Sequence, residues 1–352
     1  MPPTRRSDAP ARRARSSATP SASKSALRWP FSFRETFRFA FTASLLVALV
    51  EYVRFWRYVQ TGVGVAVSRP SVADAFLPLG GVAALKAWLA TGFWDPFHPV
   101  AIVVVVAVLL TAWLCRRAAC SWLCPIGMAS EYLSKLGTKL FGSQLHVPKW
   151  LDSALLGLKY AGTFALLFWI CATPTGTIRD FLSTPFYAVA DMKLFDVYTS
   201  FGAAIVMGVA VVVVLSLLVK SAWCRYLCPY GAVQGMFALL SPMRLVKNDE
   251  TCTGCARCNR ACPNGVDVAK AKGDVTSAEC MGCTSCVAAC PQRNTLQMRL
   301  FRTKMDPAAF GLLFIVAFMF VVTAALLTGH FGGGLPPDTY RQMLRISSDV
   351  RL

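Results

Sequence analysis

The chain has 352 residues, of which 55% are hydrophobic and only 15% are charged, and its mean hydropathy is +0.50. This composition excludes an ordinary soluble protein and is typical of membrane proteins. The formal net charge of +18 would indicate nucleic-acid binding in a soluble protein, but here the basic residues gather at the ends and between apolar stretches, as in cytoplasmic loops. We therefore expect no nucleic acid among its partners.

The amino-terminal segment is rich in Arg, Ser, Ala and Pro and has no apolar period, which predicts a disordered basic tail over residues 1–36. An apolar stretch follows at residues 37–53. No small-residue cleavage site follows this stretch, so we expect a retained membrane anchor rather than a signal peptide.

Four further stretches are apolar enough to cross the hydrocarbon core of a bilayer, which takes roughly 20 residues. They lie at residues 99–115, 153–173, 197–219 and 308–329. Residues 75–94 are also apolar, but Pro78 and Gly80 interrupt them, and we expect an interfacial or re-entrant segment there. The sequence therefore predicts an α-helical membrane protein with about five transmembrane helices.

The distribution of Lys and Arg predicts the orientation of these spans. The segments 1–36, 116–152 and 220–304 carry 25 Lys and Arg residues, whereas the loops and tail of the other face carry nine. Because basic loops stay in the cytoplasm, we expect the amino-terminal tail and residues 220–304 there, and the carboxyl terminus on the outer side.

An internal repeat relates the two halves of the membrane region. Cys120-Ser-Trp-Leu-Cys124-Pro-Ile-Gly127 corresponds to Cys224-Arg-Tyr-Leu-Cys228-Pro-Tyr-Gly231 at an offset of 104 residues. The preceding outer loops also match, with Val72-Ala-Asp74 in one and Val189-Ala-Asp191 in the other. We expect a duplicated two-span unit whose copies have the same orientation.

The strongest motif consists of two consecutive C-x2-C-x2-C-x3-C-P runs at residues 252–263 and 280–291. In bacterial-type ferredoxins with such runs, the fourth Cys binds the cluster of the other run. We therefore assign the first [4Fe–4S] cluster to Cys252, Cys255, Cys258 and Cys290, and the second to Cys280, Cys283, Cys286 and Cys262. Paired zinc sites would have longer gaps between C-x2-C pairs. A module this short, predicted at 247–304 as a small α+β insert, needs its clusters in order to fold.

The two C-x3-C-P motifs contribute a second set of four thiols. On a helix, residues four apart share a face, so each motif would present two thiols at the inner end of a span. Four thiols match the ligand number of one cluster, and we predict one shared redox site at Cys120, Cys124, Cys224 and Cys228. Redox-active dithiols and buried packing remain alternatives for these cysteines. For the unpaired Cys115 and Cys171 we expect packing.

Asp95 and His98 lie among aromatic residues at the outer end of a predicted span. They could accept protons from a quinol held by the aromatic walls, or they could simply belong to an interfacial anchor. The chain has no C-x-x-C-H motif, which excludes covalent attachment of c-type haem. It also has no evident constellation of general acid, base and nucleophile. We therefore expect an electron-transfer subunit of an oxidoreductase complex, without a substrate site of its own.

With its eight-cysteine insert and two C-x3-C-P motifs, the chain resembles the NapH/NosR-type membrane polyferredoxins over roughly residues 40–300. The resemblance implies a bacterial inner-membrane protein that passes electrons from the quinol pool, or from a cytoplasmic donor, to a periplasmic partner. NosR-like proteins carry an outer flavin-binding domain, whereas only residues 331–352 follow the last span here, so we expect a separate flavoprotein or reductase subunit. The alternative function is an assembly or metal-handling factor that reduces a metal such as copper for a respiratory enzyme.

The predicted organisation has four parts. These are a basic tail at 1–36, a membrane domain with four spans at 37–246, the ferredoxin module at 247–304, and a final span with a short outer tail at 305–352.

Overall fold

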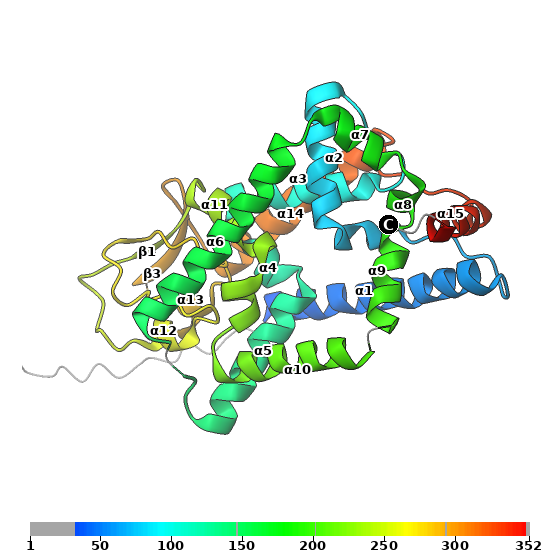
Figure 1. The fold of residues 1–352 in the computed structure, drawn as a ribbon. Helices are drawn as coiled ribbons and strands as arrows, with labels where there is room; N and C mark the ends of the chain where they lie inside the picture. Colours follow the sequence, from blue (N-terminus) through cyan, green and yellow to red (C-terminus); the bar gives the residue numbers. More distant parts are fainter. Residues whose placement is uncertain (1–31, 146, 201, 293, 350–352) are drawn as a thin grey trace, which may run out of the picture.

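The computed structural model describes residues 32–145, 147–200, 202–292 and 294–349 (Figure 1). Most of the predicted basic tail lies outside these residues. The first helix nevertheless begins at Phe33, inside the segment predicted as tail. Ser32 and Glu35 form a capping box there, and their side chains bond to free backbone N–H groups at the helix start.

Helices occupy most of the described residues from 33 to 239. In chain order they are α1 (Phe33–Thr61), the 3₁₀ turn η1 (Ser71–Phe76), α2 (Pro78–Thr91), α3 (Pro99–Cys115), α4 (Ala118–Trp122), α5 (Pro125–Phe141), α6 (Lys149–Ala172), α7 (Thr175–Leu182), α8 (Pro185–Ala188), α9 (Ala190–Ser200), α10 (Gly202–Leu218), the π-helical turn η2 (Trp223–Leu227) and α11 (Pro229–Leu239).

The ferredoxin module and the last helices follow. They comprise β1 (Met243–Lys247), α12 (Arg257–Ala261), β2 (Asp274–Val275), α13 (Ser285–Ala289), β3 (Leu296–Leu300), β4 (Thr303–Met305), α14 (Pro307–Leu327) and α15 (Pro337–Asp349).

All five apolar stretches predicted as spans are helical. Among the described residues, α1, α6 and α14 are each long and apolar enough to cross a bilayer, and α3 is a shorter apolar helix. The stretch at 197–219 differs from the prediction of one straight helix, because α9 and α10 meet at an angle of 88°. Large apolar side chains on these helices are exposed, among them Leu46, Phe164 and Leu327. Such surfaces require lipid, and the protein is an α-helical membrane protein.

The segment at 75–94 forms α2, which has only 14 residues. Pro78 is its first residue, where a missing backbone N–H is harmless. A helix of this length extends roughly 21 Å, less than the ~30 Å of a hydrocarbon core. It packs on α3.

The module contains a four-stranded antiparallel sheet in the order β2-β1-β3-β4. Leu245 of β1 pairs with Met298 of β3, and both side chains are buried. Because side chains alternate along a strand, Met243, Leu245 and Met298 share the inner face. They belong to one core with Phe310 of α14 and Trp122 of α4. The module is thus packed onto the membrane domain.

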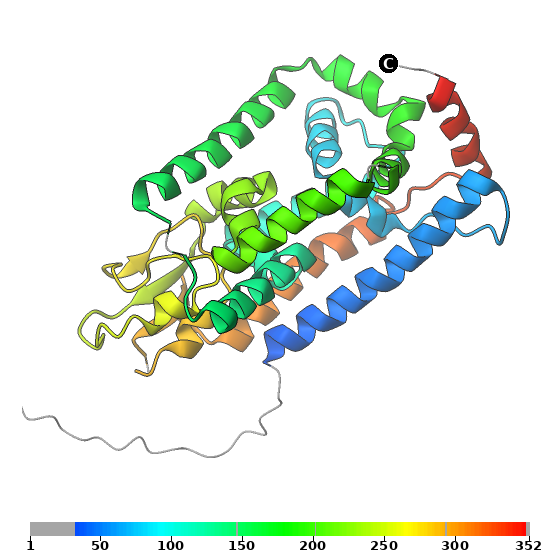
Figure 2. The same ribbon diagram turned by 60° about the horizontal axis from the view of Figure 1, so that its bottom comes forward.

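The module lies at one end of the molecule and α15 at the other (Figures 1 and 2). The amino-terminal end of α1 reaches the module, where Arg34 Nη1 donates to Ser285 Oγ over 3.3 Å. The far end of α1 contacts α15, with the rings of Phe55 and Tyr340 5.5 Å apart. Helix α1 therefore runs most of the length between the two ends.

Candidate functional site

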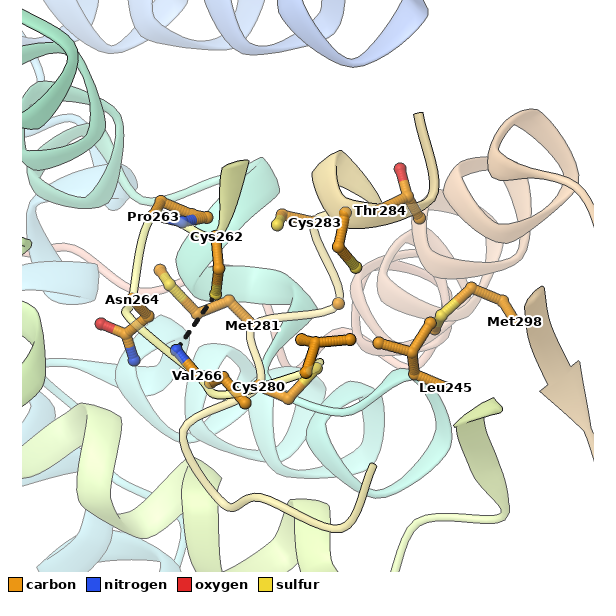
Figure 3. A pocket seen from close by; sticks show the side chains of 13 residues that line it. Leu245, Cys262, Pro263, Asn264, Val266, Cys280, Met281, Cys283, Thr284 and Met298 are labelled. Atoms are coloured by element: carbon orange, nitrogen blue, oxygen red, sulfur yellow. Dashed lines mark hydrogen bonds between the residues drawn. The ribbon is translucent and has the colours of Figure 1, made fainter. Parts of the chain in front are cut away.

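The eight cysteines of the two C-P runs line two separate cavities of the module. One cavity is lined by Cys252, Cys255, Cys258 and Cys290. The other, drawn in Figure 3, is lined by Cys262, Cys280, Cys283 and Cys286. The fourth cysteine of each run thus faces the cavity of the other run, which is the grouping of thiols that crossed ligation requires.

Two five-residue helices produce this crossing. Helix α12 contains Cys258 and has Cys262 as its C-cap, and α13 contains Cys286 and has Cys290 as its C-cap. Each helix stops there because the next residue is proline, which favours an extended conformation in the residue before it. Four residues of helix rise by roughly 6 Å, so each helix connects the two cavities over a short distance.

The backbone around both cavities has the same unusual conformation. In the first run Gly254 and Ala256 have φ values of 68° and 53°, and in the second Gly282 and Thr284 have φ values of 59° and 57°. Left-handed residues of this kind turn backbone N–H groups inward and form concave anion sites, as at many iron–sulfur clusters. One backbone N–H group also donates directly to a cysteine, because Val266 N lies 3.3 Å from Cys262 Sγ (Figure 3). The residues present therefore fit a negatively charged cluster.

The two cavities differ in their distance from the membrane domain. Cys255 of the first is exposed to solvent. The second lies against the helices, because Ser121 Oγ of α4 donates to Met281 O over 2.8 Å. A Cβ added to Gly282 would stand 3.0 Å from Cys115 O. Burial raises the pKa of Cys262 to about 12, and metal binding would have to displace this proton.

The four C-x3-C-P cysteines also come together. Burial, with smaller contributions from the thiols of Cys120, Cys124 and Cys228, raises the pKa of Cys224 to about 12. Burial, with smaller contributions from the thiols of Cys120 and Cys228, also raises the pKa of Cys124 to about 12. The four thiols are thus near enough to act on one another's charge, and their binding of one shared centre stays a prediction.

The surroundings of this site follow the repeat. Gln234 of α11, in the second copy, interacts with Cys120 of the first copy. Ser130 of α5, in the first copy, interacts with Cys224 of the second. Ser130 and Gln234 are themselves related by the offset of 104 residues. Each copy thus contributes a polar side chain to the other copy's thiol, which is an approximate two-fold arrangement.

The expectation that each cysteine pair lies on one continuous helix is wrong. Helix α4 ends at Trp122, and Cys124 is the N-cap of α5, with Pro125 at its first position. Cys228 caps α11 in the same way. A proline inside a helix would lose a hydrogen bond and clash with the preceding turn, so both helices break before it.

The break itself is conserved between the two copies. Cys124 N donates to Ala119 O and Cys228 N donates to Trp223 O, both over 3.0 Å and both five residues back. Such widened turns occur frequently at functional sites. In the first copy the backbone of Gly127 packs closely against the carbonyl oxygen of Cys120, and a Cβ at this position would collide with that oxygen. Only glycine fits this position.

A buried ionic cluster joins the module to the C-x3-C-P site. Glu279, next to Cys280, accepts from Arg117 Nη1 and from Lys159 Nζ, each over 2.6 Å. Tyr160 and Asn264 donate to the same carboxylate over 2.7 and 3.0 Å. Although burial alone would raise it, Arg117 and Lys159 hold the pKa of Glu279 below its usual value.

Arg117 also faces the C-x3-C-P thiols. Its Nη2 lies 3.5 Å from Cys224 O, and its guanidinium interacts with Cys120. One fully buried arginine therefore lies between a ferredoxin cavity and the third group of cysteines. Its positive charge would balance a negative cluster on either side.

Among the described residues, no three His, Cys, Asp or Glu side chains converge as a single metal ion would require. Thiols that bind one zinc ion would all lie ~2.3 Å from it. In the module the cysteines instead line the walls of two cavities, four to each.

Asp95 and His98, the predicted quinol contacts, are buried and bonded to protein. Asp95 Oδ1 accepts from the backbone N–H of His98, and its Oδ2 accepts from Tyr187 Oη. His98 Nδ1 lies 2.9 Å from Asp74 Oδ1, and its Nε2 lies 2.8 Å from Tyr187 O. Both residues thus connect the segment before α3 to Asp74 of η1 and Tyr187 of α8.

Two family models match the chain at these sites. A 4Fe-4S dicluster domain matches residues 244–291. A 4Fe-4S binding domain matches twice, at 97–144 and 201–248, and each match contains one C-x3-C-P motif. The two matches begin 104 residues apart, the same offset that relates Cys120 to Cys224.

The chain is similar to the putative electron transport protein YccM of Escherichia coli K12, with 35% identity over 86% of this chain and 88% of YccM. The chain belongs to the NapH/NosR-type family of membrane polyferredoxins. It is also similar to the ferredoxin-type protein NapH of Escherichia coli K12, with 23% identity over 45% of this chain and 52% of NapH. The regulatory protein NosR of Pseudomonas aeruginosa is 29% identical over 42% of this chain and 20% of NosR.

No solved structure matches the chain. Membership of the polyferredoxin family, together with the matching 4Fe-4S domains, makes the chain an iron–sulfur electron-transfer protein of the membrane.

Proposed function

We propose that the chain relays electrons through three iron–sulfur centres between a quinol pool or cytoplasmic donor and a periplasmic redox partner. Two centres would be [4Fe–4S] clusters in the cavities of the module, held by Cys252, Cys255, Cys258 and Cys290, and by Cys262, Cys280, Cys283 and Cys286. The third would be held by Cys120, Cys124, Cys224 and Cys228. Such clusters take up and release electrons singly.

The observation that carries this proposal is the continuous succession of the three thiol groups. Helices α12 and α13 connect the first cavity to the second. The Ser121–Met281 hydrogen bond and the Arg117–Glu279 ion pair connect the second to the C-x3-C-P cysteines. Electron transfer weakens steeply with distance, and this succession provides short steps from an exposed cysteine to the membrane domain.

The residues of the chain would have distinct tasks in this relay. Left-handed turns in the module supply backbone donors, and Arg117 supplies positive charge between two centres. Helices α4, α5 and α11 and the turn η2, which contain or adjoin these cysteines, would surround the third site. A separate flavoprotein or reductase subunit would exchange electrons with the exposed end of the module.

The shared third centre is tested by changing one ligand from each copy. We expect anaerobically purified protein to contain about eight irons in the module, four per cubane, and further iron at the third site. Cys124→Ser and Cys228→Ser should each remove the same electron paramagnetic resonance signal, because each leaves the site one ligand short. The double variant should lose no further signal.

Cys171→Ser is the matched control, since Cys171 is an exposed cysteine outside all three groups. It should retain the full iron content and every signal. Additive losses in the double variant, or single variants with unchanged iron, would contradict a shared centre. Rapid reoxidation of the reduced protein by free Cu(II), but not by proteins co-purified from native membranes, would contradict the relay.

A further inference from the structure

A cavity of about 420 Å³ lies between helix α5 and the ferredoxin module. This volume is within the range of ligand-binding pockets, ~300–1,000 Å³, but the walls of such pockets are usually apolar. Here much of the wall is charged or bears hydroxyl groups. Among the wall residues are Ser134, Lys135, Gln144, Lys220, Arg260 and Ser285. The class of ligand therefore follows from the charge of the wall and from its free hydrogen-bonding groups.

The α5 side of the cavity carries excess positive charge. Glu131 is the only acidic residue among the described residues of the wall, and it already pairs with Arg34 over 2.5 Å and with Arg38 over 2.8 Å. Lys135 shares the same carboxylate over 3.0 Å and lies 3.9 Å from Glu35. Although burial alone would raise it, the three cations lower the pKa of Glu131 to about 2. Three cations thus face two carboxylates.

Two more cations come from the opposite walls, and they differ in what they bind. Lys220 Nζ donates to three backbone carbonyl oxygens at the end of α12, over 3.0–3.3 Å. Its donors are therefore used by the module. Arg260 is exposed, its Nη2 donates to Cys255 O over 3.3 Å, and its other N–H groups bond to no further described residue. Arg260 and the half-exposed Lys135 are the cations that remain accessible to a ligand.

Two hydroxyl groups of the wall can also donate. Ser134 Oγ accepts from the backbone N–H of Ser221 over 3.0 Å, and Ser285 Oγ accepts from Arg34 Nη1 over 3.3 Å. Neither hydroxyl donates to another described residue, so each keeps a proton for a ligand. A wall with cationic and hydroxyl donors, whose carboxylate is already paired, fits an anion with several acceptor oxygens, such as a phosphate group.

The cavity adjoins a helix with a lipid-exposed surface. Helix α5 packs on α10 (Figure 1), and Gln144 of the cavity wall donates to Leu217 O of α10 over 3.2 Å. Large apolar side chains are exposed near this end of α10 and on α5, among them Val214, Leu215 and Leu140. An acyl chain that covers these side chains would therefore bring its head group to the cavity.

We propose that this cavity binds the phosphate head group of an anionic phospholipid, with the acyl chains along α10 and the phosphate near Lys135 and Arg260. Basic pockets beside membrane helices bind such head groups at the cytoplasmic face. Lys135 belongs to the membrane domain and Arg260 to the module, so the bound phosphate would connect the two. This site needs no electron transfer and does not depend on the proposed relay.

The charge of the wall and its place beside α10 distinguish this ligand from two others. A zwitterionic phospholipid has the same phosphate, but its ammonium group would meet the excess positive charge of the wall. A soluble phosphate ester would use the same donors and leave the apolar surface of α10 uncovered. An anionic phospholipid satisfies both the donors and the apolar surface.

The test is isothermal titration of the full-length, anaerobically purified protein in dodecyl maltoside. The probes are dihexanoylphosphatidylglycerol, dihexanoylphosphatidylcholine and sn-glycerol 3-phosphate. We expect the phosphatidylglycerol to bind about tenfold tighter than the phosphatidylcholine, because several basic residues attract its net charge. It should also bind about tenfold tighter than glycerol phosphate, which has no acyl chains. Lys135→Gln and Arg260→Gln should each weaken phosphatidylglycerol binding by about tenfold.

Lys139→Gln is the matched control, since Lys139 is an exposed lysine one turn further along α5 and is not part of the cavity wall. Its affinity for phosphatidylglycerol should be unchanged. If Arg260→Gln loses iron, Lys135→Gln keeps the test valid, because Glu131 retains Arg34 and Arg38.

Three results would overturn the proposal. Equal affinities for the two lipids would exclude recognition of the anionic head group. Equal losses in Lys135→Gln and Lys139→Gln would indicate attraction to the basic surface as a whole. Binding of glycerol phosphate as tight as that of phosphatidylglycerol would make the cavity a site for soluble phosphate esters.

Discussion

At the scale of single residues, the carboxylate of Glu279 is the contact on which the junction between module and membrane domain depends most. It is the common partner of Arg117 and Lys159, whose side chains are both fully buried. Removing one member of a buried ionic cluster leaves uncompensated charge, which typically costs ~3–5 kcal/mol. Burial of these cations is therefore tolerated only while Glu279 is present.

We predict that Glu279→Gln destabilises the protein by about 3–5 kcal/mol, because two buried cations would lose their counter-ion. Chemical denaturation, followed through the visible absorbance of the module and through protease sensitivity near residue 279, measures the effect. Asp274→Asn is the control, since its contact with Arg244 is 4.0 Å long and half exposed, and such pairs contribute only ~0–1 kcal/mol. Equal losses in the two variants would contradict the role given to Glu279.

The sequence identified the cysteines but not Glu279. Cysteine spacing is local and can be read from one short segment, whereas Arg117 and Lys159, the ionic partners of Glu279, are more than a hundred residues away. A lone acidic residue before a cysteine carries no signal of its own. The repeated Val-Ala-Asp motif did carry a sequence signal, and the carboxylates of its two copies both form ion pairs with Arg69.

At the scale of elements, the short helices α12 and α13 decide which thiols face which cavity. Each has a cysteine of its own run near its start and a cysteine for the opposite cavity at its end. Changing the last cysteine of one run is therefore expected to remove a ligand from the cluster of the other run.

We predict that the spectrum of Cys262→Ala resembles that of Cys280→Ala rather than that of Cys252→Ala, because Cys262 lines the second cavity. Cys258→Ala should resemble Cys252→Ala. Electron paramagnetic resonance of the four reduced variants, with iron analysis, makes the comparison. If Cys262→Ala matched Cys252→Ala, each run would hold its own cluster and the crossed assignment would be wrong.

Element boundaries were harder to predict than element types. The helical character of the five apolar stretches follows from composition, but the breaks at Cys124 and Cys228 follow from the proline after each cysteine. The proline signal was present in the sequence and should have ended the helices there. The 88° bend between α9 and α10 has no proline in residues 197–219, but Ser200 and Gly202 lie on either side of the break, and Gly/Ser pairs are a common cause of sharp kinks.

At the scale of the whole molecule, the two ends of α1 contact different parts of the chain. Arg34 reaches the module at one end, and Phe55 reaches α15 at the other. The module and the start of α1 thus lie at one end of the molecule and α15 at the other. That the module's end is cytoplasmic stays a prediction from the basic residues.

We predict that reporter fusions after Arg302 and after Asp349 report opposite sides of the membrane. A cytoplasmic reporter should be active after Arg302, and a periplasmic reporter after Asp349, because α14 lies between them and is long enough to span. A third fusion after Gly142 should agree with the one at Arg302. Identical reports from Arg302 and Asp349 would mean that α14 does not cross.

The two-fold arrangement around the third group of cysteines has a consequence for the ancestry of the fold. One repeat unit provides two thiols and one polar neighbour, Ser130 or Gln234, that serves the thiol of the other unit. A shorter ancestral polypeptide with a single unit could gather four thiols only by pairing with a second copy of itself in the same orientation. Gene duplication and fusion would have made that pairing permanent, and the two halves could then diverge, as Ser130 and Gln234 already have.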